Sequence, residues 1–247
     1  MFTKISKISC LLVCALTTLP ALAQESGTLK KISETNTIIV GHRESSIPFS
    51  YLDDKQQPIG YSMDLCLKIV DAVKVRLKLP GLQVKFNPVT SQTRIPLMTN
   101  GSIDLECGST TNSVERQKQV AFGVSTFVTS VRLMVKANSG IKSLIDLDGK
   151  AVATTSGTTS DRYIKQTETG KHIDVKNIYG KDHAESFLLL ETDRAAAFVM
   201  DDVLLAGLIA NAKRPADFAI VGEALSVEPY GIMLRRDDAP FKKLVDE

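Results

Sequence analysis

Strand-like and helix-like segments alternate along this chain, and their order restricts the possible folds more than any other feature. In the first half, β-branched and apolar runs predict strands at residues 37–40, 82–89 and 103–107. A helix from Ser62, the expected N-cap, to about Leu77 separates the first two strands, and a short helix ending near Gly101 separates the next two. This β-α-β-α-β order predicts a mainly parallel sheet covered by helices.

A second unit repeats the same order in the second half of the chain. Strands are expected at residues 131–135, 151–154, 173–178 and 195–200, with later candidates at 220–221 and 230–234. Helices are expected to begin at residues 157–160 and to span 203–210, and residues 142–150 indicate a connecting turn with a short helix. The fold class is therefore α/β, and the length fits one large domain or two small ones.

The first 23 residues are typical of a cleaved signal peptide. Lys4 and Lys7 form a positive n-region, residues 10–16 form a short apolar core, and residues 21–23 provide an A-x-A cleavage site. The apolar run is too short to span a bilayer. We therefore expect a soluble, secreted chain that begins at Gln24.

The net charge of the secreted chain gives no support for two classes of partner. The whole sequence has 30 Lys and Arg against 28 Asp and Glu, and the loss of Lys4 and Lys7 leaves 28 of each. A balanced chain has no electrostatic basis for binding nucleic acid or an anionic membrane surface.

Two cysteines remain after cleavage, Cys66 and Cys107, which is neither a disulfide framework nor a metal site. Cys66 belongs to the apolar face of the first predicted helix, which also contains Leu65, Ile69, Val70, Val73 and Leu77. Cys107 ends a predicted strand. Secretion would permit a bridge between them, but their separate elements lead us to expect two separately buried thiols.

Polar residues gather at the carboxyl ends of the predicted strands, which is where open α/β sheets bind ligands. In the first unit these residues are Arg43, Ser91, Arg94, Ser109, Thr111 and Arg116. In the second unit they are Thr159, at a helix N-terminus with Thr158, His183 after a strand, and Asp201 at the end of another. Their joint placement predicts one binding site.

The charges of this set indicate the class of ligand. An arginine guanidinium is a planar fork that matches a carboxylate, and three arginines in one unit suggest two carboxylates. The free N–H groups near Thr159 also favour an anion, whereas Asp201 suits an ammonium group. Two carboxylates and one ammonium describe glutamate or aspartate.

Each residue also has a structural interpretation that involves no ligand. A single arginine is usually a solvated surface residue, Ser109 and Thr111 are suited to caps or turns, Asp201 or Asp202 to an N-cap, and His183 to a packed or surface position. The prediction therefore depends on the whole set.

Six segments of this sequence resemble the periplasmic glutamate/aspartate-binding proteins of ABC transporters. They are GHRESSIPFSY at 41–51, TSQTRIPL at 90–97, ECGSTTNSVERQ at 106–117, TSGTTS at 155–160, KDH at 181–183 and MDD at 200–202. The resemblance covers essentially the whole mature chain. It implies a periplasmic-binding-protein-like fold with two lobes, residues 24–129 with 233–247 and residues 130–232, joined by two hinge strands and closing on the ligand.

The resemblance also implies a role for each site residue. Arg43, Ser91, Arg94, Ser109 and His183 would surround the side-chain carboxylate of the ligand. Thr111, Arg116 and Thr159 would hold its α-carboxylate, and Asp201 would take its α-ammonium. The implied partners are L-glutamate or L-aspartate and the membrane permease of an ABC importer, with no cofactor, no metal and a monomeric protein in the periplasm.

Two other functions are weighed against solute binding. Some proteins with this fold are dehydratases acting on small carboxylates, in which Asp201 would be a general acid or base, but the sequence shows no paired acid/base set or catalytic Cys/His pair. A sensory domain would need a fused output module, and none is present. Residues 241–247 resemble an unfinished helix, so we expect the natural chain to continue and to complete the first lobe.

Overall fold

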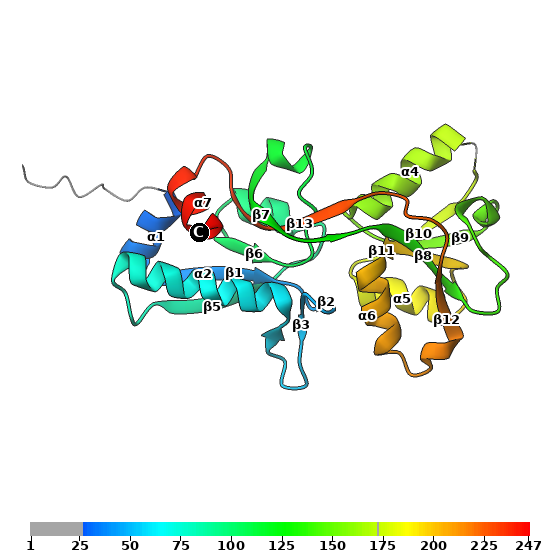
Figure 1. Ribbon diagram of the computed structural model, residues 1–247, viewed down its shortest axis with the longest axis horizontal. Coiled ribbons are helices and arrows are strands. Elements are labelled where there is room, and N and C mark those ends of the chain that lie inside the picture. The colour runs from blue at the N-terminus through cyan, green and yellow to red at the C-terminus, as the bar shows by residue number, and fades with distance from the viewer. Residues whose placement is uncertain (1–26, 172) are drawn as a thin grey trace, which may run out of the picture.

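The computed structural model describes residues 27–171 and 173–247, so the expected signal peptide at residues 1–23 lies outside the described residues. Within these ranges the chain forms two five-stranded sheets and one three-stranded sheet. The two larger sheets lie in separate lobes that long strands connect (Figure 1). The expected two-lobed α/β architecture is confirmed.

The first lobe is built on the sheet with strand order β5-β1-β6-β13-β7. Its strands are β1 (Thr37–His42), β5 (Gln83–Pro88), β6 (Leu105–Cys107), β7 (Val120–Thr129) and β13 (Glu228–Arg235). Helices α1 (Gly27–Thr35), α2 (Tyr61–Leu77) and α7 (Ala239–Asp246) share one apolar core with this sheet, and α3 (Arg94–Thr99) shares another. A small sheet of β2 (Ser45–Ser46), β3 (Ser50–Leu52) and β4 (Pro58–Ile59) precedes α2, and a 3-10 helix, η1 (Arg116–Lys118), precedes β7.

The second lobe is built on the sheet with strand order β10-β9-β11-β8-β12. Its strands are β8 (Val131–Lys136), β9 (Ala151–Thr155), β10 (Lys176–Gly180), β11 (Ala197–Asp201) and β12 (Phe218–Val221). Helices α5 (His183–Glu191) and α6 (Asp202–Ala210) pack on one face, and α4 (Thr159–Lys171) packs on the other. Two 3-10 helices, η2 (Leu144–Leu147) and η3 (Pro215–Asp217), lie in its connections.

Each large sheet has four strands that run in one direction and one strand that runs against them. In the first lobe, β5, β1 and β6 are parallel neighbours, and β13 is antiparallel to both β6 and β7. In the second lobe, β10, β9 and β11 are parallel neighbours, and β8 is antiparallel to both β11 and β12. The opposed strands β8 and β13 directly follow the passages of the chain between the lobes, so neither follows a helical crossover within its own sheet.

The chain passes between the lobes twice. The first passage is at Ser130, between β7 and β8, and the return lies between β12 and β13. The two connecting strands β7 and β13 pair with each other from Glu228 and Thr129 to Arg235 and Val120. The exact division at 129/130 and 232/233 stays a prediction, and position 232 lies inside β13.

Helix α2 begins differently from the prediction. Its first residue is Tyr61, which follows Gly60, and the Ser62 hydroxyl does not cap the helix. That hydroxyl instead donates to the main-chain carbonyl of Gly108 at 2.7 Å. Ser62 therefore ties α2 to the segment that follows β6, where several predicted site residues lie.

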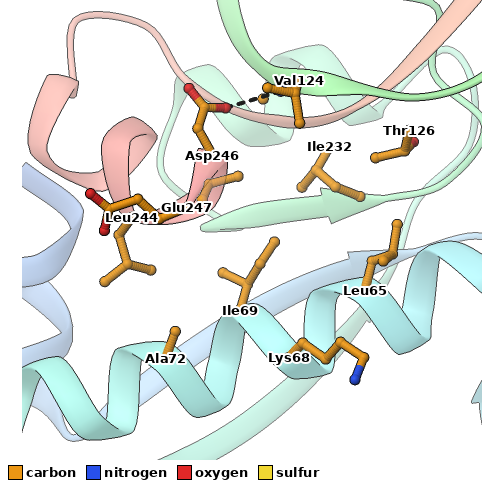
Figure 2. Close-up of a pocket in the computed structure, with 12 residues that line it drawn as sticks. Leu65, Lys68, Ile69, Ala72, Val124, Thr126, Ile232, Leu244, Asp246 and Glu247 are labelled. Carbon is orange, nitrogen blue, oxygen red and sulfur yellow. Dashed lines mark hydrogen bonds between the residues drawn. The ribbon is translucent and has the colours of Figure 1, made fainter.

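The apolar face of α2 is only partly buried. Val73 and Cys66 have no solvent exposure, whereas Leu65 and Ile69 are partly exposed. Figure 2 shows Leu65 and Ile69 beside a groove of about 340 Å³ whose other walls include Ile232 and residues 244–247. The predicted apolar face of α2 therefore contacts two environments, which are the core beneath the sheet and this groove.

Cys66 and Cys107 form a disulfide, so the prediction of two separate thiols is wrong. Helix α2 packs directly across β6 and brings the two Cα atoms to 6.2 Å, which is within the range that a disulfide spans. The sequence places the cysteines on different elements but does not show how those elements pack. The bond fixes α2 to the strand that leads into the site.

We expect the disulfide to contribute about 4 kcal/mol to stability, from the loop-closure entropy of a crosslink that spans 41 residues. The double variant Cys66→Ala/Cys107→Ala should lose this amount of unfolding free energy in urea titrations under oxidising conditions. Reduced wild-type protein should match the variant. Equal stability of the oxidised wild type and the double variant would contradict the estimate.

Candidate functional site

The predicted site residues meet between the two lobes. Eight of the nine line one small cavity: Ser91, Arg94, Ser109, Thr111, Arg116, Thr159, His183 and Asp201. The ninth, Arg43, stands beside it, with its Nη2 3.5 Å from Nε2 of His183. Thr158, Met200 and Leu204 complete the lining. Sequence reasoning missed Met200 and Leu204 as site residues because an apolar lining residue carries the same signal as a core residue.

Backbone position explains why these side chains converge. Arg43 directly follows β1, and Arg94 is the first residue of α3 after β5. In the other lobe Thr159 and His183 each begin a helix, and Asp201 ends β11. The carboxyl ends of the parallel strands in both sheets therefore face one another, as the sequence predicts.

The lobes are in close contact at this cavity. Its free space is about 10 Å³, which is room for about one water molecule. Contacts cross from one lobe to the other around it: the Arg116 guanidinium donates to the Gly157 carbonyl at 3.4 Å, and Ala184 N–H donates to the Ser45 hydroxyl at 3.4 Å. An amino acid can enter only if the lobes move apart.

All three predicted arginines are buried, so the interpretation of them as solvated surface residues is wrong. Arg43, Arg94 and Arg116 are 1%, 2% and 3% exposed. Burial, followed by the charge of Arg94, lowers the pKa of Arg43 to about 10 and that of Arg116 to about 9. These guanidinium groups remain charged at neutral pH. They make the electrostatic potential in the cleft positive, which favours the binding of an anion.

His183 is a neutral imidazole that faces an arginine. Its Nδ1 lies 3.0 Å from the Thr155 hydroxyl, which lies 2.8 Å from the Ser186 hydroxyl. Ser186 donates to a main-chain carbonyl, so Thr155 donates to Ser186 and accepts from Nδ1–H. The Nε2 lone pair therefore faces Arg43. Burial, then the charges of Arg43 and Arg94, hold the pKa of His183 well below its usual value.

Asp201 is the only predicted site residue with a negative charge. It is 4% exposed and accepts a hydrogen bond from the Tyr230 hydroxyl. It occupies the N-cap position of α6, but its side chain makes no capping bond. Burial, followed by repulsion from Glu228, raises the pKa of Asp201 to about 7. A cation beside this carboxylate would reverse that shift.

Glu228 joins the two lobes through a single carboxylate. One oxygen accepts from the Thr111 hydroxyl of the first lobe at 2.6 Å and from the Thr159 hydroxyl of the second lobe at 2.8 Å. The other oxygen accepts from the Ser226 hydroxyl at 2.5 Å. Sequence reasoning missed Glu228, because its position at the start of β13 becomes meaningful only when the interlobe connection is known.

Buried polar atoms without a hydrogen-bond partner among the described residues concentrate here. Six of the seven belong to this region: Arg43 Nη1, Ser91 Oγ, Arg94 Nε, Glu106 Oε1, Ser109 Oγ and Asp201 Oδ1. Buried polar groups are normally paired, so this concentration makes the cavity the candidate ligand site. The arginine atoms are donors and the Asp201 oxygen is an acceptor, which suits a ligand with both an anionic and a cationic group.

Residues 38–247 match the model of the bacterial extracellular solute-binding proteins, family 3. The chain belongs to this family. It is 54% identical over 244 residues to the L-glutamate/L-aspartate-binding protein of Pseudomonas aeruginosa, covering 98% of this chain and 81% of the relative. It is 53% identical over 220 residues to the glutamate/aspartate import solute-binding protein of Escherichia coli, covering 89% of this chain and 73% of the relative.

Solved structures show the same architecture. A mutant of ArgBP from T. maritima has a TM-score of 0.78 and 27% identity, covering 88% of this chain and 90% of that one. The predicted class, a solute-binding protein rather than an enzyme, is confirmed by the family, which gives no support to the dehydratase alternative.

In the described ranges, no group of three acidic, His or Cys side chains is arranged to hold a metal ion, and no helix has the length and apolar character for crossing a membrane.

Two glycines let the lobes of this family member approach closely. A Cβ on Gly157, whose φ is +80°, would lie 2.8 Å from Cα of Gln92 in the other lobe. A Cβ on Gly207 would lie 2.6 Å from the main-chain oxygen of Ile47. Both neighbouring atoms are backbone, so a side chain at either glycine would keep the lobes further apart.

We expect Gly207→Ala to open the cleft without harming helix α6. Alanine is better than glycine in a helix by about 1 kcal/mol, but its methyl group meets the backbone at Ile47. At saturating glutamate, small-angle scattering should therefore show a larger radius of gyration for the variant than for wild type. Gly170→Ala is the matched control, because a Cβ there has open space around it. Identical scattering of Gly207→Ala and wild type would refute the steric argument.

Proposed function

We propose that this chain is a periplasmic solute-binding protein that captures L-glutamate or L-aspartate and delivers it to the permease of an ABC importer. The proposal depends mainly on buried donors of Arg43, Arg94, Ser91 and Ser109 that face a buried acceptor of Asp201, none of which has a hydrogen-bond partner among the described residues. A dicarboxylic amino acid supplies the complementary groups. The names of the relatives from P. aeruginosa and E. coli support the same ligand class.

The proposed roles follow from charge and position. Arg43, Ser91, Arg94 and Ser109 receive the side-chain carboxylate, and neutral His183 holds Arg43 through the contact at Nε2. Thr111, Arg116 and Thr159 hold the α-carboxylate, near the N-terminus of α4, where the first N–H groups have no partner within the helix. Asp201 takes the α-ammonium.

Hinge closure is the proposed mechanism. The arginines and Ser91, Ser109 and Thr111 belong to the first lobe, and Thr159, His183 and Asp201 belong to the second. The cavity is too small for an amino acid when the lobes are in contact, so the ligand enters an open form. A bound ligand then interacts with both walls, and this additional interaction shifts the population toward closure.

Location and assembly complete the proposal. Residues 1–23 act as a cleaved signal peptide that directs a monomeric chain to the periplasm. The first lobe comprises residues 24–129 with 233–247, and the second comprises residues 130–232. The permease recognises the closed, loaded shape.

Calorimetric titration tests the ligand class. We expect saturable binding of L-glutamate and L-aspartate, and binding of glutamine and asparagine that is weaker by roughly a hundredfold or more. An amide accepts fewer charge-assisted hydrogen bonds and leaves a buried guanidinium without its anion. Equal affinities for glutamate and glutamine would contradict the proposal. A result in which no amino acid binds would also contradict it.

Glutamate affinity should also depend on pH through Asp201. Its pKa of about 7 in the free protein falls when an ammonium group binds beside it, so binding releases a proton. Affinity should therefore drop as pH falls below 7, by roughly tenfold or more between about pH 7.5 and about pH 5.5. Titration calorimetry at both pH values measures this directly.

Asp201→Asn provides the control for the pH effect. An asparagine at this position does not titrate, so glutamate binding should be weak at both pH values with little difference between them. A variant with the pH dependence of wild type would show that another group is responsible.

A further inference from the structure

A carboxylate lies behind the arginines and has no part in the proposed ligand contacts. Glu106 sits in the middle of β6, between β1 and β13, and has no solvent exposure. Its neighbours Leu105 and Cys107 belong to the core beneath α2. Side chains alternate along a strand, so Glu106 points to the other face of the sheet, where α3 carries Arg94. A buried carboxylate is unfavourable unless it is compensated by charge and hydrogen bonds.

Thr110 connects Glu106 to Arg94. The Thr110 hydroxyl donates to Oε2 of Glu106 at 2.7 Å, and Nη1 of Arg94 donates to the same hydroxyl at 2.6 Å. A hydroxyl has one proton, and this proton goes to the carboxylate, so the oxygen of Thr110 is available as the acceptor for Arg94. The order Arg94 to Thr110 to Glu106 is therefore the only one that these three groups allow.

This chain of bonds fixes one side of the Arg94 guanidinium. Nη1 is occupied by Thr110, whereas Nε has no partner among the described residues, and the side chain lines the cavity. The negative charge of Glu106 also opposes the repulsion between Arg94 and Arg43. Gly108 leaves room for this packing, because a Cβ there would lie 2.9 Å from Cγ of Arg43 and closer still to the Glu106 carboxylate.

We propose that Glu106 and Thr110 are positioning residues that orient Arg94 toward the side-chain carboxylate of the ligand and so set the preference for an acid over its amide. The inference rests on the proposed function, in which Arg94 receives that carboxylate. A purely structural pair would stabilise the turn after β6 and would affect glutamate and glutamine alike. The two roles therefore differ in selectivity rather than in stability.

Thr110→Val removes the hydroxyl and keeps the shape of the side chain. We expect its glutamate affinity to fall by about tenfold to a hundredfold, the range for one hydrogen bond to a charged group. Glutamine affinity should change much less, so the ratio of the two affinities should shrink. Thr110→Ser retains the hydroxyl and should restore both the affinity and the ratio.

Thr28→Val is the matched control. Thr28 is also buried and also accepts from an arginine, Nη2 of Arg235 at 2.7 Å, in the same lobe but outside the site. This variant should lower the melting temperature and leave the ratio of glutamate to glutamine affinity unchanged. Calorimetry for both ligands and a melting curve are recorded for each variant.

Glu106→Asp gives a second measurement, because it keeps the charge and shortens the reach to Thr110 by one methylene. It should reproduce the loss of selectivity seen for Thr110→Val, and it decides the question if Thr110→Val does not fold. An unchanged affinity ratio in the folded variants would overturn the proposal, and loss of folding in both would show that the pair sustains the fold instead. Failure of the wild-type protein to bind glutamate or aspartate would count against the proposed function itself.

Discussion

The burial of three guanidinium groups between the lobes is the constraint on which the rest of the cleft depends. A buried charge without a partner costs several kcal/mol, and Arg43, Arg94 and Arg116 are almost completely removed from solvent. The chain compensates with buried carboxylates at positions 106, 201 and 228 and with a histidine that burial and the arginines keep neutral. Among the described residues this compensation is incomplete: arginine donors have no hydrogen-bond partner on one wall of the cleft, and an Asp201 oxygen has none on the other.

The two connecting strands determine how the two charged walls of the cleft are linked. Because β7 and β13 pair along their lengths, the lobes are linked by a two-stranded ribbon rather than by two independent linkers. The site draws its groups from both sides of that ribbon. Glycines at 157 and 207 remove the side chains that would hold the walls apart, so the approach of the lobes is limited by backbone contact.

The sequence predicts the positions of the polar residues better than their partners. The placement of Arg43, Arg94 and Asp201 follows from strand ends, which a local pattern reveals. The partners depend on long-range packing, that is, on which elements touch. Examples are the pairing of Cys66 with Cys107, the partial exposure of the apolar face of α2, and the hydrogen bond from the Thr110 hydroxyl to Glu106. Strand β7 was missed for the same reason, since six of its ten residues are partly or fully exposed and lack the buried pattern of a sheet strand.

The disulfide gives the chain a different stability before and after oxidation. Disulfide bonds form in oxidising compartments, whereas cysteines in the cytosol are kept as reduced thiols. In the reduced state the chain lacks the covalent bond between α2 and β6, so its first lobe unfolds at a lower free-energy cost. Oxidation adds that bond and makes unfolding to an extended chain more costly. In the proposed periplasmic location, the same pair of cysteines would therefore separate a form that is easier to unfold before export from a more stable form after export.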